Sequence, residues 1–219
     1  MPFWRPRGCV LWLDFLEPSG SVAYDKSGYG NHGTVHGAQR VRSLGRWGLE
    51  FDGVDDYVEV PDSPSLDSVS ENNALTIIVL VKWDVVPTSD MEILEKHNNI
   101  FGLWHDDGKY LAARLTSEAG GWHDLRYEWL PKPGRWYLIA FTFDGVTRAL
   151  WINGERVASA EEALKMGASD YPLYIGTYDA RINWHDGVIA LVHIYNRALT
   201  ADEIKANYTY FFSHLKGEV

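Results

Sequence analysis

The side chains best suited to binding chemistry alternate along the segment 122–129, which reads Trp-His-Asp-Leu-Arg-Tyr-Glu-Trp. Successive side chains of an extended strand point to opposite faces, so Trp122, Asp124, Arg126 and Glu128 share one face. A face with two carboxylates and a guanidinium cannot enter a core without a large desolvation cost. We therefore expect this face to look onto solvent or into a wet groove.

A neighbouring segment extends this face, because Tyr110 and Arg114 fall on one parity and apolar residues on the other. Trp104, Trp184 and Tyr178 lie in or beside expected loops and can join the same surface. Flat rings cover the C–H face of a sugar, and carboxylate or guanidinium groups bind neighbouring hydroxyls in pairs. We interpret these residues as a carbohydrate-binding surface. The alternative is a solvated strand face crossed by Arg–carboxylate pairs.

Catalysis receives little support from the residue patterns. Asp124 and Glu128 are separated by about 13 Å along a strand, whereas a retaining glycosidase holds its two carboxyl groups about 5–5.5 Å apart. No Glu-x-Asp-x-x-Glu run, nucleophile elbow, phosphate loop or dinucleotide fingerprint occurs, and none of the eight histidines forms a His-Glu-x-x-His motif. A single cysteine, Cys9, excludes an intramolecular disulfide. We expect a protein that is not an enzyme.

Charge and hydropathy narrow the range of partners. The 219 residues carry a formal net charge of −10, and a field of that sign repels nucleic-acid backbones. No apolar run approaches the roughly 20 residues of a membrane-spanning helix, and no signal peptide is recognisable at the N-terminus. We expect neither nucleic-acid binding nor membrane insertion.

Turn signals between short apolar runs indicate an all-β fold. Hairpin dipeptides occur at 107–108, 144–145 and 153–154, and the last two join three strands within 136–157 into a meander. About a dozen such strands predict a sandwich or barrel, with 75–81 as a central strand buried on both faces. A capping box, Thr200 to Glu203, predicts a short helix ending near Asn207, and 161–166 is a second candidate helix. No linker or shift in composition divides the chain, so we expect one domain over residues 1–219.

Several segments, taken in order, are similar to the LamG-like branch of the concanavalin A-like lectin/glucanase superfamily. They are residues 13–20, 24–33, 48–60, 134–136, 143–145, 151–155 and 187–200, so the resemblance runs from about residue 10 to 208. The resemblance implies a jelly roll of two curved antiparallel sheets, one concave and one convex. The strand pattern predicts the same architecture independently.

The glycine-rich segment 25–33 is a candidate calcium loop, because successive carbonyl oxygens can face one point there and Ca²⁺ takes six to eight oxygens. The resemblance implies Asp25, an oxygen near Asn31 and an acidic residue in the C-terminal strand as ligands. The position usual for that acidic residue is Ala190, so Asp186 is the candidate substitute. The alternative is that the Asp25 carboxylate caps amides of its own turn.

The resemblance implies a non-catalytic module that binds a carbohydrate or a glycosylated surface. A structural or protein-adhesion domain of a cell envelope, virion or surface protein is the alternative, and a hydrolase with a rearranged site is a third hypothesis. An extracellular, cell-surface or virion-surface location is favoured by the resemblance alone.

Overall fold

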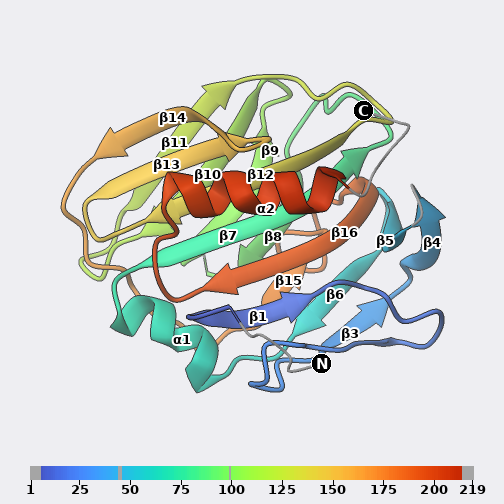
Figure 1. The fold of residues 1–219 in the computed structure, drawn as a ribbon, viewed down its shortest axis with the longest axis horizontal. Coiled ribbons are helices and arrows are strands. Elements are labelled where there is room, and N and C mark those ends of the chain that lie inside the picture. The colour runs from blue at the N-terminus through green and yellow to red at the C-terminus, as the bar shows by residue number, and fades with distance from the viewer. Residues whose placement is uncertain (1–5, 44–45, 99, 214–219) are drawn as a thin grey trace.

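The computed structural model describes residues 6–43, 46–98 and 100–213, and in these ranges two antiparallel sheets form a sandwich (Figure 1). The first sheet has the order β14 (Glu155–Glu161), β13 (Thr147–Ile152), β12 (Trp136–Phe143), β7 (Leu75–Trp83), β16 (Asp186–Tyr195), β5 (Arg46–Asp52) and β4 (Gln39–Ser43), and β1 (Cys9–Leu13) pairs with the second half of β16. The second sheet has the order β11 (Trp122–Glu128), β10 (Tyr110–Thr116), β9 (Phe101–Asp106), β8 (Met91–Lys96), β15 (Leu173–Ile175), β6 (Tyr57–Val60), β3 (Gly33–His36) and β2 (Val22–Ala23). The sandwich expected from the sequence is confirmed.

The core fills the space between the two sheets, and β7 illustrates why. Ile77, Val79 and Val81 alternate toward the second sheet, whereas Ile78 and Leu80 point away from it, and all five are at most 1% exposed. The prediction that this strand is buried on both faces is confirmed. The meander of β12, β13 and β14 is also confirmed, with its last turn formed by Asn153 and Gly154 at positive φ.

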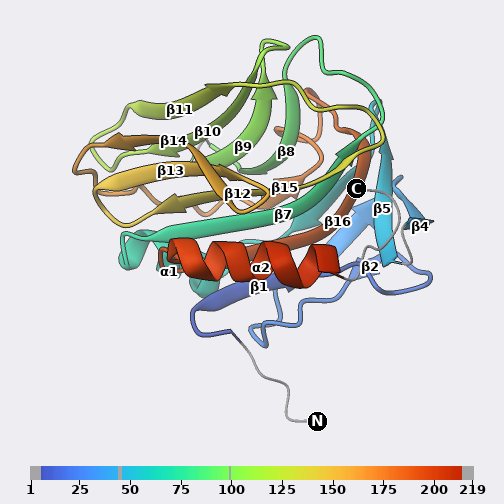
Figure 2. The same cartoon turned by 45° about the horizontal axis from the view of Figure 1, so that its top comes forward.

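Helix α2 (Ala201–Ser213) covers the face of the first sheet that turns away from the core, so the molecule has three layers (Figure 2). Its capping box is confirmed: the Glu203 carboxylate accepts from the Thr200 amide at 2.9 Å, and the Thr200 hydroxyl accepts from the Glu203 amide at 3.3 Å. The helix runs past the expected end at Asn207 because Ile204 and Phe211 bury apolar surface against the sheet.

One expected helix is absent from the described residues, and one observed helix was not expected. Residues 161–166 form no helix, since Glu161 ends β14 and Met166 forms a β-bridge with Ser117. Helix α1 (Pro64–Glu71) is not anticipated by the sequence analysis, although Ser63 caps it by accepting from the Leu66 amide. A serine followed by proline is a helix-start signal that could have located it. Neither helix of the described residues has the length and apolar character needed to span a bilayer.

Candidate functional site

Strand register places six residues in one row across the outer face of the second sheet, the face turned away from the first sheet. Residues paired directly across antiparallel strands point to the same side. The row consists of Asp124 on β11, Arg114 on β10, Gly102 on β9, Glu95 on β8, Tyr174 on β15 and Glu59 on β6. The polar face expected on 122–129 is therefore part of a surface that crosses the sheet.

Arg114 is the centre of the predicted site. Its Nε and Nη2 atoms donate to the two carboxylate oxygens of Asp124 at 2.6 and 2.8 Å, which is a bidentate pair. Its guanidinium carbon lies 4.2 Å from the ring centroid of Trp122 and 5.1 Å from that of Trp104. The structure thus brings four predicted ligand-binding residues together. Trp122 remains 65% exposed, while Trp104 is 7% exposed.

Arg126 extends the network on the same face. Its Nε atom is 2.9 Å from a carboxylate oxygen of Asp106, and its Nη2 atom is 3.4 Å from Asp124. The Asp106 carboxylate also accepts from the Trp104 indole at 3.2 Å. Both arginines therefore form ion pairs with carboxylates. The alternative expected from the sequence, a strand face crossed by Arg–carboxylate pairs, is correct in part.

A cavity of about 160 Å³ opens beside Arg114. Its walls come from strands β8 to β11 and from the segment that follows β15, and they consist of Asp90, Glu92, Glu95, Trp104, Asp106, Arg114, Trp122, Tyr178, Ile182 and Asn183. A void of roughly 150 Å³ is large enough for a six-membered ring such as benzene. We call this cavity the acidic pocket.

Glu92 and Glu95 line the pocket and were missed by the sequence analysis. Strict alternation would send two residues three apart to opposite faces, but β8 has a bulge between Glu92 and Leu94 that returns both carboxylates to the pocket side. Each residue is 2% exposed. Two glutamates beside Met91, Ile93 and Leu94 in one short strand were the available signal, since carboxylates are rarely fully buried unless they are paired.

The electrostatics of this pair are unfavourable when both carry charge. Burial, followed by the neighbouring Glu95, raises the pKa of Glu92 well above its usual range. Among the described residues, Oε1 of Glu92 is buried without a hydrogen-bond partner. A Cβ atom at Gly102 would collide with Oε2 of Glu95, so glycine at this position leaves the space that the carboxylate occupies.

The remaining predicted ligand residues lie on either side of the acidic pocket. Tyr110 and Glu128 pair with each other at the far ends of β10 and β11 and are not among the described residues that line the pocket. Trp184 contacts Tyr57, with ring centroids 6.2 Å apart, and Tyr57 stacks on His36 at 4.3 Å. The aromatic surface is therefore wider than predicted and reaches β6 and β3.

The predicted calcium ligands do not converge. The Asp25 carboxylate accepts from the amides of Trp12, Ser27 and Asn31 and from the Ser27 hydroxyl, at 2.6–3.0 Å. Trp12 pairs with His193 on β16, and Asp186 lies seven residues earlier on that strand, a separation of roughly 23 Å. Asp25 thus caps its own turn, as the alternative reading proposed, and Asp186 lies elsewhere.

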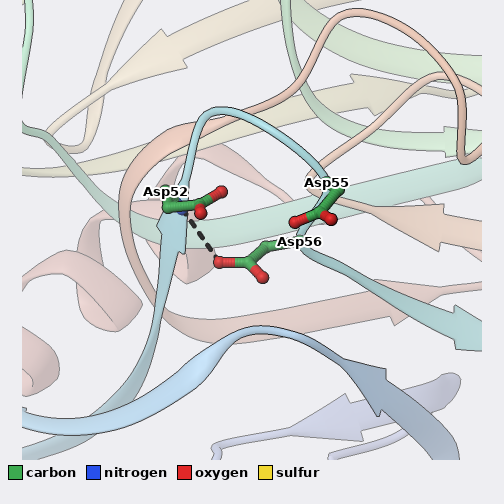
Figure 3. Close-up of side chains that lie close together, drawn as sticks. All are labelled: Asp52, Asp55 and Asp56. Atoms are coloured by element: carbon green, nitrogen blue, oxygen red, sulfur yellow. Dashed lines mark hydrogen bonds between the residues drawn. The ribbon is translucent and has the colours of Figure 1, made fainter.

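Asp186 instead borders a different acidic cluster, formed by Asp52, Asp55 and Asp56 at the turn after β5 (Figure 3). The three residues can offer carboxylate oxygens that all lie within 4.8 Å of one another, so they could hold a metal ion. Asp56 also accepts from the Asp52 amide at 3.0 Å, which fixes the turn. Burial and neighbouring aspartates raise the pKa of Asp56.

The two antiparallel sheets and the helix on the outer side of the first sheet define a β-sandwich fold. Residues 52–205 match the profile of the concanavalin A-like lectin/glucanases superfamily, and the chain belongs to that superfamily. The family suggested by the sequence motifs is confirmed. A comparison with curated protein sequences finds no match.

Solved structures of similar fold come from larger proteins. The binding domain of Paraclostridial Mosquitocidal Protein 1 has a TM-score of 0.79 at 16% identity and matches 94% of this chain and 52% of its own. The receptor-binding domain of botulinum neurotoxin C/D mosaic serotype has a TM-score of 0.74 at 15% identity, and the match covers 93% of this chain and 51% of the toxin chain. Trypanosoma rangeli sialidase has a TM-score of 0.70 at 19% identity, and the match covers 97% of this chain and 34% of the sialidase chain. The chain thus spans about half of the toxin domains, and the likeness establishes the fold.

Proposed function

We propose that this protein is a non-catalytic binding module that recognises carbohydrate on the outer face of its second sheet. The observation that carries the proposal is the exposed Trp122 ring beside the paired Arg114 and Asp124, at the mouth of a ring-sized pocket. An exposed ring offers apolar contact to a sugar, and fixed charged groups beside it select hydroxyl orientation.

The toxin domains among the similar structures support a binding role, while another similar structure is a sialidase. One of the toxin binding domains is in complex with rat synaptotagmin II. The last example keeps a protein partner as the second candidate. An exposed aromatic side chain can anchor either a protein or a glycan, so an experiment must decide between these two classes of ligand.

Replacing Trp122 with alanine is expected to weaken glycan binding at least tenfold. A buried aromatic anchor contributes about 2 kcal/mol or more at an interface, and about 1.4 kcal/mol corresponds to a factor of ten. The measurement is a glycan array followed by calorimetry on the best ligand. Tyr29→Ala is the matched control, because Tyr29 is 60% exposed and lies in the loop between β2 and β3. We expect this control to bind like the wild type.

The outcomes separate the candidate functions. Saturable binding that is lost in Trp122→Ala and kept in Tyr29→Ala supports the glycan module. An array with no hit across diverse polysaccharides would favour the protein-adhesion domain. Release of reducing sugar from a bound oligosaccharide, abolished by Glu92→Gln, would make the protein a hydrolase and contradict the non-catalytic part of the proposal.

We further propose that Asp52, Asp55 and Asp56 bind a structural Ca²⁺. Carboxylate oxygens suit Ca²⁺, and extracellular modules bind it with a Kd of about 10⁻⁴–10⁻³ M. About 10 mM Ca²⁺ is then expected to raise the midpoint of thermal unfolding by about 3–8 °C over a chelator-treated sample. Asp55→Asn is expected to abolish this shift, and Asp107→Asn, also exposed, to preserve it. An unchanged midpoint in the wild type would contradict calcium binding.

A further inference from the structure

The acidic pocket carries an excess of negative charge. Asp90, Glu92, Glu95 and Asp106 contribute carboxylates to its walls, against the guanidinium of Arg114 in the walls and that of Arg126, which is paired with Asp106. The Arg114 guanidinium is already engaged in the bidentate pair with Asp124. A pocket with this balance repels anionic ligands, such as sugars with a carboxylate, and attracts cations.

Glu92 shows where a cation would bind. Its side chain is buried and lines the pocket, and its Oε1 atom has no hydrogen-bond partner among the described residues. A buried carboxylate oxygen without a partner costs free energy, and a cationic donor would remove that cost. Glu92 pairs with Trp104 and Glu95 with Gly102, two ladder positions apart on the same face, so a donor with more than one N–H group can reach both carboxylates.

The surroundings favour an organic cation over a metal ion. Within the described ranges, three acidic groups converge closely enough for a metal at Asp52, Asp55 and Asp56. These residues lie at the turn after β5 and do not line the acidic pocket. The walls of the acidic pocket are instead aromatic, with Trp104, Trp122 and Tyr178. Ring faces attract ammonium and guanidinium groups, and an ammonium donates three hydrogen bonds.

We propose that the acidic pocket selects a glycan bearing a primary amine, with its ammonium group between Glu92 and Glu95 and its sugar ring toward Trp122. This inference rests on the proposed carbohydrate function and names its ligand class, an amino sugar with a free amine. Acetylation of the amine removes both its charge and two of its N–H donors. The N-acetylated sugar should therefore bind much more weakly.

A pair of matched probes tests this proposal. Tetramers of β-1,4-linked glucosamine and N-acetylglucosamine differ only at the amine, and at about pH 6 an amine of ordinary basicity is protonated. Calorimetry on the wild type should show at least tenfold tighter binding of the glucosamine tetramer, and added salt should reduce this preference. Glu92→Gln and Glu95→Gln should each remove most of the preference, whereas Glu155→Gln, on an exposed position of β14, should retain it.

The result distinguishes this inference from the proposed function. Equal affinity for the two tetramers, or a preference for the acetylated one, would overturn the amine selectivity and leave the glycan module standing. Failure to bind either tetramer or any glycan on the array would overturn both. The preference of the wild type is itself a readout, so the test does not depend on either glutamine variant folding.

Discussion

Gly187→Ala is expected to lower the midpoint of thermal unfolding by roughly 10 °C, the largest stability effect we predict for a single methyl group. Gly187 has φ +143°, a conformation that side chains with a Cβ rarely adopt. An added Cβ would collide with the carbonyl oxygen of Lys82 and lie 2.9 Å from Cα of Trp83. Both atoms belong to β7, the central strand of the first sheet, so neither can move aside easily.

The matched control for this variant is Gly120→Ala. Gly120 also has positive φ, +78°, but no atom lies within 4 Å of a Cβ built there. Gly120→Ala therefore measures only the cost of positive φ for a residue with a Cβ, about 1–2 kcal/mol. This cost corresponds to a decrease in the midpoint of thermal unfolding of no more than about 8 °C. Equal midpoints for the two variants, measured by circular dichroism, would contradict the role assigned to the close approach of β16 and β7.

Arg114→Met is expected to destabilise the protein by about 3 kcal/mol and to abolish ligand binding. The side chains of Arg114 and Asp124 are 15% and 21% exposed, and removing one partner of a largely buried ion pair leaves an uncompensated charge on the other. Here the uncompensated charge would include Asp124 and the buried pair Glu92 and Glu95. Methionine keeps much of the length of the side chain, so the loss reports charge more than packing.

The destabilisation by Arg114→Met should depend on pH. The pKa of Glu92 is raised, through burial and then through Glu95 and Asp90, while Arg114 opposes this shift. A raised pKa means that the folded state binds the proton more tightly, so the contribution of Glu92 to stability is fully present below its ordinary pKa of 4.5 and is lost as pH rises above that value. Loss of Arg114 should increase the stability that is lost as pH rises. The difference in free energy of unfolding between the variant and the wild type should therefore become smaller on acidification.

Two comparisons isolate the electrostatic cause. Adding Glu92→Gln to Arg114→Met should recover part of the lost stability, because one buried charge is removed. Arg181→Met breaks an Arg–carboxylate pair at a side chain that is 76% exposed, and should change stability by less than about 1 kcal/mol. Denaturant unfolding at about pH 4 and pH 7 provides the measurement, and a difference that is the same at both values would rule out the buried carboxylates as its source.

Much of the fold could be predicted because its signals are local. The turn at Asn153 and Gly154 requires positive φ, which these residues tolerate, and the structure has both in that region. The uninterrupted apolar run of β7 reflects burial on two faces. Strands β2, β3 and β4 went unrecognised because they are short or polar and gain their stability from pairing with neighbours.

The part of the candidate site on β10 and β11 could be predicted from the sequence. Alternation along 122–129 identified Trp122 and Asp124, and the neighbouring strand identified Arg114, because the period of a regular strand is two. Glu92 and Glu95 escaped the same rule because a bulge changes the period locally. The predicted ligand set of Asp25, Asn31 and Asp186 does not come together for a related reason, since the position of Asp186 depends on the register of β16 and not on nearby sequence.

By itself, the sequence determined the class of this protein: its motifs indicate the superfamily, its turn signals indicate two antiparallel sheets, and its charge argues against nucleic acid. The tertiary structure decided which chemical groups meet. Strand order and register bring Asp124, Arg114, Glu95 and Tyr174 into one row from segments up to 79 residues apart, between 95 and 174. The bulge in β8 then adds a second carboxylate, and the pocket becomes acidic. Such convergence follows from long-range pairing, whose free energy depends on the whole sheet and leaves no local pattern to read.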